Sequence, residues 1–200
     1  MSKEIVPAQF TGDKSLSEHT VSKSSAAQAI ETYRIAREKL LSVNDWDKVC
    51  GPHSANFQLM DDKGNPIHDR AAVANYIRID LPGPGTKAGS GYDWVIIETI
   101  EDKNSPSGDC NYTAIKVRPT ESPVDAAKQT AHFYKPTATS SFIVERVGTR
   151  ITAYVYGRNE SPNTKVNSIL DRIRNLIISI STFLGFQKPQ WKSLVVGLLK

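Results

Sequence analysis

Residues 157–164 (GRNESPNT) hold the side chains best placed for chemistry, because this stretch joins a predicted strand to a predicted long helix. The first N–H groups of a helix have no partner within it and form the positive end of the helix dipole. Beside them, Arg158, Asn159 and Ser161 could bind an anion such as a phosphate or a carboxylate. The alternative is ordinary capping, in which Ser161 caps the helix and Arg158 pairs with Glu160 or with a strand carboxylate.

A second candidate cluster follows from the alternation of residues 150–157. Tyr154, Tyr156 and Arg158 share one face of this predicted strand, since successive side chains of a strand point to opposite sides. In a compatible register Arg118 would join that face, and Trp94 is a further lining candidate from a neighbouring strand. Such a face could line a ligand pocket. It could equally be the solvent side of a sheet that is covered on one face only.

The sequence contains no established catalytic or metal-binding pattern. Its two cysteines, Cys50 and Cys110, are far apart and form no CxxC pair, so neither a disulfide framework nor a zinc site is predicted, and no cofactor is expected. The remaining catalytic candidates are His132, Asp93 and Glu98. Glu98 could be a base with a raised pKa or the partner of a strand arginine. Whether the chain is an enzyme is therefore left open.

A long helix over residues 162–184 is expected to position the first cluster. Its apolar residues recur at steps of three and four: Val166, Ile169, Ile173, Leu176, Ile180 and Phe183. This spacing is typical of a helix packed along its whole length against apolar surface. At ~1.5 Å per residue the helix would be about 34 Å long, enough to cross a small domain.

The other elements are shorter. Residues 1–23 are predicted to be a flexible N-terminal arm with a short strand near residues 5–10. Ser25 and Gln28 form a capping-box pattern at the start of a helix whose apolar face recurs to Val43. Apolar runs and alternation between turn signals predict strands over 57–60, 75–81, 92–101, 112–118, 139–147 and 150–157, the last two joined across Gly148 and Thr149.

These elements predict one α+β domain over residues 24–200. Short connections favour antiparallel neighbours, so we expect a curved antiparallel sheet of about six strands packed on the long C-terminal helix, with the N-terminal helix beside it. This order resembles the helix-grip arrangement, in which a long C-terminal helix lies across a curved sheet. A small barrel with the helix as its plug fits the pattern equally well.

Composition narrows the classes of partner. The 200-residue chain is 39% hydrophobic and carries a net charge of +4, with a basic C-terminal part: residues 146–200 contain nine Lys or Arg but only two acidic residues. Such an end attracts anions or is simply the solvated side of a helix. Sparse basic residues and the lack of an RNP-type aromatic pattern argue against nucleic acid. The apolar run at 176–186 is too short to span a membrane, and the start lacks a secretory signal, which predicts a cytoplasmic protein.

Two functions follow from these patterns. The first is a small-molecule binding domain for an amphipathic or anionic ligand held between the sheet and the long helix. The second is a structural or interaction domain, in which the apolar C-terminal segment docks on a partner or on a second copy to form a homo-oligomer. That segment contains Trp191, Leu194, Val195, Leu198 and Leu199. It could instead fold back on its own core.

Overall fold

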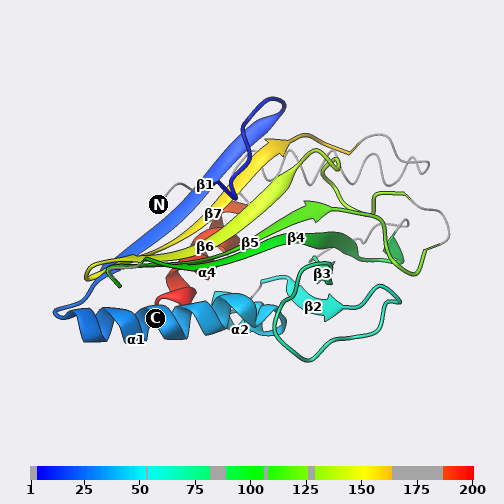
Figure 1. Cartoon of the computed structure of the whole chain (residues 1–200). Coiled ribbons are helices and arrows are strands. Elements are labelled where there is room, and N and C mark those ends of the chain that lie inside the picture. Colours follow the sequence, from blue (N-terminus) through cyan, green and yellow to red (C-terminus); the bar gives the residue numbers. More distant parts are fainter. Residues whose placement is uncertain (1–3, 53, 82–88, 106–107, 126–128, 164–186) are drawn as a thin grey trace.

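One seven-stranded antiparallel sheet organises the chain, in the strand order β1-β7-β6-β5-β4-β3-β2. The computed structural model describes residues 4–52, 54–81, 89–105, 108–125, 129–163 and 187–200 (Figure 1). The strands are β1 (Asp13–Ser22), β2 (Asn56–Met60), β3 (Tyr76–Asp80), β4 (Asp93–Asn104), β5 (Cys110–Pro119), β6 (Thr139–Val147) and β7 (Arg150–Glu160). The helices are α1 (Ala26–Leu41), the short 3₁₀ helix η1 (Val43–Asp45), α2 (Trp46–Cys50) and α4 (Gln187–Leu198).

The sheet is curved, and α1, α2 and α4 cover one of its faces (Figure 1). We call this the inner face and the opposite one the outer face. Six of the seven strands lie where the sequence predicted them, including the hairpin of β6 and β7 across Gly148 and Thr149. Within the described residues β1 and β2 are the two edges of the sheet. An open sheet of this kind is helix-grip-like, and the small-barrel alternative is not adopted.

Strand β1 is a correction to the sequence analysis. The predicted strand near residues 5–10 is absent, and residues 13–22 of the expected arm form a full strand paired with β7, with Glu18 opposite Tyr154. The sequence signal was weak because none of the ten residues of β1 is fully buried. Its hydrogen bonds to β7 hold it in place instead. Ile5 is buried, and Ser141 Oγ donates to its carbonyl oxygen at 3.2 Å.

Helix α1 begins as the sequence predicted. Ser25 is its N-cap and accepts a hydrogen bond from the Gln28 backbone N–H at 3.3 Å, while the Gln28 side chain accepts from Ser24 Oγ at 2.7 Å. The buried residues of the helix are Ala29, Tyr33, Ala36, Leu40 and Leu41, which confirms the predicted apolar face. This face packs on the inner side of the sheet.

The main hydrophobic core lies between the inner face and the helices. Alternation along β7 sends Ile151, Ala153 and Val155 into this core, while Tyr154 and Tyr156 contact a smaller cluster on the outer face. The largest fully buried apolar side chains of the main core are Trp46, Leu40, Leu59, Ile77, Ile97, Ile115, Ile151, Leu194 and Leu198.

The C-terminal segment is part of that core. Helix α4 confirms the predicted helical spacing, and its Leu194, Val195 and Leu198 are at most 1% exposed. It packs against α1, α2, β1 and β7. The apolar C-terminal segment is therefore occupied within its own chain, which corrects the expectation that it docks on a partner. Nearly all of the long helix predicted over residues 162–184 lies outside the described residues.

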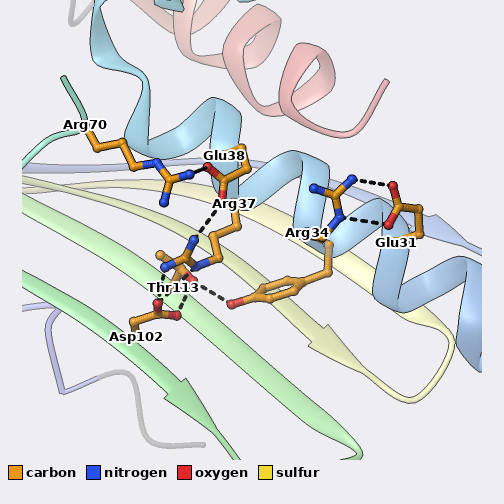
Figure 2. A network of polar contacts seen from close by, with 8 residues as sticks. Glu31, Arg34, Arg37, Glu38, Arg70, Asp102 and Thr113 are labelled. Atoms are coloured by element: carbon orange, nitrogen blue, oxygen red, sulfur yellow. Dashed lines mark hydrogen bonds and ion pairs between the residues drawn. The ribbon is translucent and has the colours of Figure 1, made fainter. Parts of the chain in front are cut away.

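A polar network fastens the middle and the C-terminal half of α1 to the sheet (Figure 2). Arg37 Nε donates to Asp102 Oδ2 at 3.0 Å, and Thr113 Oγ1 donates to Asp102 Oδ1 at 2.9 Å. The Tyr33 hydroxyl lies 2.5 Å from Thr113 Oγ1. Partial burial opposes ionisation of Asp102, but the hydrogen bonds from Arg37 and Thr113 outweigh it and lower the pKa of this carboxyl. Asp102 is thus held as a charged anchor for α1.

Candidate functional site

A narrow cavity of about 40 Å³ lies on the inner face, under α2 and α4. Six strands (β2 to β7), helices α2 and α4 and the segment before β6 contribute to its wall. The lining residues are Trp46, Phe57, Ile77, Ile79, Val95, Val117, His132, Phe133, Tyr134, Ser140, Phe142, Glu160 and Trp191. A space of this size holds a few water-sized groups, at roughly 10–15 Å³ each. The cavity is thus aromatic and aliphatic with a few polar side chains, the composition expected of a small-molecule site.

Aromatic rings from four elements meet around this cavity. The Trp46 ring centroid lies 4.6 Å from that of Phe142 and 5.4 Å from that of Phe57. Trp191 on α4 lies 5.2 Å from Phe142 and 6.3 Å from Phe57. Edge and tilted contacts of this kind are favourable between rings. On the α4 side the cavity is lined by Trp191, which is only partly buried.

The segment 130–134 brings three further rings to the cavity. It is hydrogen-bonded to the start of β4: Trp94 N–H donates to Ala131 O at 2.7 Å, and Phe133 N–H donates to Asp93 Oδ1 at 3.1 Å. On its other side Asn163 N–H donates to Phe133 O at 2.7 Å. Asp93 is therefore a buried acceptor that positions the backbone, which argues against the catalytic role considered for it.

His132 is buried and faces the cavity. Its Nδ1 accepts the Tyr134 backbone N–H at 2.9 Å, and its ring stacks on Phe133 with centroids 4.3 Å apart. A neutral imidazole that accepts at Nδ1 carries its proton on Nε2. Glu98, the other catalytic candidate, lies on the outer face and pairs with Arg118. The structure therefore places these two candidates on opposite faces of the sheet.

Glu160 supplies the carboxyl group of the cavity. Ser15 Oγ on β1 donates to its Oε1 at 3.3 Å. Burial raises the pKa of Glu160 to about 7, and the nearby Asp13 carboxylate adds to the effect, while the Ser15 hydroxyl and Arg158 oppose it. The group therefore changes charge near neutral pH in apolar surroundings.

A bulge in β7 explains why Glu160 faces inward. Asp13 pairs with Glu160 and Ser15 pairs with Gly157, so two residue steps on β1 match three on β7. Asn159 adopts a left-handed backbone (φ 57°) at this place. The extra residue reverses the alternation, so Glu160 leaves the outer face of Tyr156 and Arg158 and joins the inner cavity.

The predicted cluster at the end of β7 does lie together, but on the outer face. The rings of Tyr154 and Tyr156 stack with centroids 5.7 Å apart, and Arg158 Cζ lies 5.1 Å from the Tyr156 ring centroid. Arg158 Nη1 donates to Gly157 O at 2.8 Å. None of these three side chains lines the cavity.

Arg118 and Trp94 also lie on the outer face. Arg118 binds Glu98 through two nitrogens and donates from Nη1 to Pro136 O at 2.7 Å, while Lys116 Nζ lies 3.4 Å from Glu98 Oε2. Partial burial opposes ionisation of Glu98, but these cations lower its pKa overall. This confirms the ion-pair interpretation of Glu98. The Trp94 ring packs with Met60 and Ala131.

Asn159 has a structural role in the described chain. Its Oδ1 accepts from Phe10 N–H at 2.8 Å and from Thr11 N–H at 3.1 Å, and its Nδ2 donates to Ala8 O at 3.1 Å. Asn159 therefore fixes residues 8–11 to the end of β7. The backbone carbonyl of Ser161 accepts from Lys135 N–H at 2.9 Å. Of the helix that Ser161 was predicted to cap, only residues 162 and 163 are described, and they are not helical: Pro162 forms a β-bridge with Tyr134.

The residues that line the cavity were largely missed by sequence reasoning. Only His132 and Trp191 had been singled out, for catalysis and for docking. Phe142 lies in the strand predicted over residues 139–147, whereas the sequence analysis assigned no role to Trp46. The sequence pattern did not place Glu160 on the inner face, because alternation alone puts it on the same face of the strand as Arg158.

Among the residues that the structure describes, no three or more His, Cys, Asp or Glu side chains are arranged to hold a metal ion. In the same part of the chain, no helix combines the length and apolar character that a membrane span needs.

Comparison with known proteins gives structural similarity only. No family model matches the chain, and no curated protein matches it. A truncated norcoclaurine synthase from Thalictrum flavum aligns over 97% of this chain and 96% of its own, with 9% identity and a TM-score of 0.40. A START superfamily protein from Mycobacterium smegmatis aligns over 92% and 98%, with 12% identity and a TM-score of 0.36, and Ara h 8.0201 over 94% and 99%, with 8% identity and a TM-score of 0.38. The fold assignment rests on the strand order and register described above.

Proposed function

We propose that this chain binds a small amphipathic molecule in the inner-face cavity. The observation that carries the proposal is a carboxyl group, Glu160, set in a cavity whose wall is otherwise mainly aromatic and aliphatic. Apolar lining with a few polar groups is the usual composition of a small-molecule site. The apolar body of the ligand would contact Trp46, Phe142 and Trp191, and its polar end would meet Glu160.

The charge of the lining favours a hydrogen-bond donor or a cation over an anion at that polar end. Ionised Glu160 attracts an ammonium group and repels a carboxylate, and both effects are stronger in apolar surroundings than in water. Arg118 and Arg158, which would have served an anion, lie on the opposite face of the sheet. The anionic-ligand alternative of the sequence analysis is therefore the weaker one.

The space is small for anything beyond a few heavy atoms, so ligand entry requires the wall to move. Trp191 is the element of the wall suited to this, because it is partly exposed and lies on α4, while Trp46 is 1% exposed. We expect Trp191 to swing outward when a ring-sized ligand binds.

Two probes with the same aromatic body and opposite charge test the proposal: 2-phenylethylamine and 3-phenylpropionate. At pH 8 the amine should shift the indole NMR signals of Trp46 and Trp191, and the acid should not. At pH 6, where Glu160 is mostly protonated, amine binding should weaken several-fold. Native mass spectrometry of protein purified from its own host would then identify the natural ligand.

Glu160→Gln is the informative variant and Arg158→Ala its matched control on the outer face. The first should abolish the preference for the amine, and the second should leave it unchanged. Shifts confined to Trp94, or equal binding of both probes by both variants, would contradict a site at Glu160.

A further inference from the structure

In the part of the chain that the structure describes, no strand pairs with β1 on the side away from β7. Strand β1 is the last strand in the order of the sheet and lies along its margin (Figure 1). Lys14, Leu16 and Glu18 are exposed, and Leu16 is 50% exposed although it is a large apolar side chain. An edge of this length is a template for pairing with another strand unless something blocks it.

The hydrogen-bonding pattern shows which residues of β1 face that edge. Lys23 N–H donates to Thr149 O at 3.0 Å, and the register continues without a break from Ser22 opposite Arg150 to Leu16 opposite Tyr156. In an antiparallel ladder alternate residues direct their backbone groups to the same neighbour. Odd-numbered residues of β1 therefore bond to β7, and the even-numbered ones direct N–H and C=O to the open edge.

We propose that two copies of this chain associate by antiparallel pairing of their β1 strands, with the twofold axis at Leu16. Leu16 then faces Leu16 of the second copy, and Lys14 faces Glu18 of the second copy. On the inner side Asp13 faces His19 of the second copy. The Leu16 pair lies on the axis and occurs once, whereas the Lys14–Glu18 and Asp13–His19 pairs each occur twice. Lys14, Leu16 and Glu18 are all even-numbered, so their backbone groups point to the open edge and can form the hydrogen bonds between the copies.

The charge pattern selects this register over its neighbours. Moving the axis to Glu18 places Glu18 opposite itself, and like charges directly opposite one another are destabilising. Moving it to Ser17 places Leu16 opposite Glu18 and leaves Lys14 opposite Thr20. Only the axis at Leu16, among the axes from Ser15 to His19, pairs both charged residues of the exposed row with opposite charges.

The charged side chains of Lys14 and Glu18 are available for pairing between the copies, as far as the described part of the chain shows. No salt bridge of Lys14 or Glu18 occurs there, so pairing between copies would give each of these charges its first close partner in that part. The axis also buries the exposed Leu16 side chains against one another. A second copy would thus hydrogen-bond the free backbone edge, pair the charges of Lys14 and Glu18, and bury the Leu16 side chain.

Charge exchange tests the proposal by sedimentation equilibrium. The wild-type chain should form a dimer whose dissociation constant rises about tenfold in Lys14→Glu and in Glu18→Lys, since each substitution turns two attractions into two repulsions. The double variant restores both pairs with their signs exchanged, so it should regain the wild-type dissociation constant. Both substituted side chains are solvent-exposed, and equal thermal unfolding of the three variants and the wild-type chain would show that the fold is unchanged.

Cysteine cross-linking gives a second readout. Residues opposite one another in a hydrogen-bonded antiparallel pair have Cα atoms about 5.5 Å apart, within reach of a disulfide. Leu16→Cys should therefore cross-link on mild oxidation. Ser22→Cys should not cross-link, because Ser22 lies on the same row but about 40 Å from Ser22 of the second copy in this register. This variant also controls for the native cysteines. A monomer at all concentrations, a dimer insensitive to charge exchange, or equal cross-linking of both variants would overturn the proposal.

Discussion

Glu160 Oε1 occupies the space that a side chain at Gly157 would need: a Cβ atom built on Gly157 would lie 2.1 Å from it. The other close atom is Ser15 Oγ, at 2.3 Å. Gly157→Ala should therefore push the Glu160 carboxyl out of the cavity and return its pKa toward the ordinary value of 4.5. NMR titration of the carboxyl carbon would measure this. The stability cost should be small, about 1 kcal/mol, because the displaced groups are ends of side chains.

Gly197 provides the contrast. A Cβ there would lie 2.1 Å from the backbone oxygen of Val49, which cannot rotate away. Gly197→Ala should force α4 from α2 and cost more than Gly157→Ala in urea unfolding. Equal losses of unfolding free energy in the two variants would show that a clash with a backbone atom costs no more than one with the end of a side chain.

Removal of the Glu160 carboxyl should change the pH dependence of stability. Because the folded pKa lies above the unfolded value of 4.5, the folded state binds the proton more tightly. Relative to Glu160→Gln, the wild-type protein should lose stability as pH rises from 4.5 to about 7 and then stay level, by about 3 kcal/mol in all. Unfolding free energies of both proteins across this range would measure it, and a constant difference would contradict a buried carboxyl.

The anchor of α1 should depend on the charge of Asp102. Asp102→Asn weakens the hydrogen bonds from Arg37 and Thr113, and since the Asp102 side chain is 38% exposed we expect a loss of only about 1 kcal/mol. The loss should shrink as pH falls below 3.8, where Asp102 itself becomes neutral on unfolding. Arg34→Ala, which removes the exposed pair with Glu31 on the same helix (Figure 2), should leave stability unchanged.

Truncation of Trp191 should enlarge the cavity without removing a core anchor. Trp191→Ala is expected to lower the free energy of unfolding by about 2–3 kcal/mol, the lower part of the range for buried aromatic residues, because the side chain is only partly buried. The enlarged space should bind xenon or benzene, measurable by NMR shifts of Trp46 and Phe142. Leu198→Ala, at a fully buried position of the same helix, should cost as much or more and leave xenon at the cavity unchanged.

The fold was predictable where one face of an element is buried. Ala29, Tyr33, Ala36 and Leu40 marked α1, and apolar runs and alternation between turns marked β2 to β7, because burial of one face imposes a period on the sequence. Strand β1 lacks that signal. None of its side chains is fully buried. Its stability comes from backbone pairing with β7, which depends on residues more than a hundred positions away and leaves little trace in local composition.

The site was less predictable, for two physical reasons. Alternation correctly grouped Tyr154, Tyr156 and Arg158 on one face, but it does not say which face the helices cover. The bulge at Asn159 then reversed the direction of Glu160, and a bulge depends on the pairing of β7 with β1 rather than on β7 alone. The cavity residues therefore had to be found in three dimensions.

The neighbouring positions of β1 and β7 have a consequence for synthesis. Strand β1 is made about 130 residues before β7 and cannot pair with it until β7 has been synthesised, which at ~5–20 residues per second takes roughly 6 to 26 seconds. Contacts between such distant parts of a chain also form slowly in refolding. Pairing of β1 with β7 is thus expected to be a late event of folding, and until then the edge of β7 that β1 covers stays unpaired.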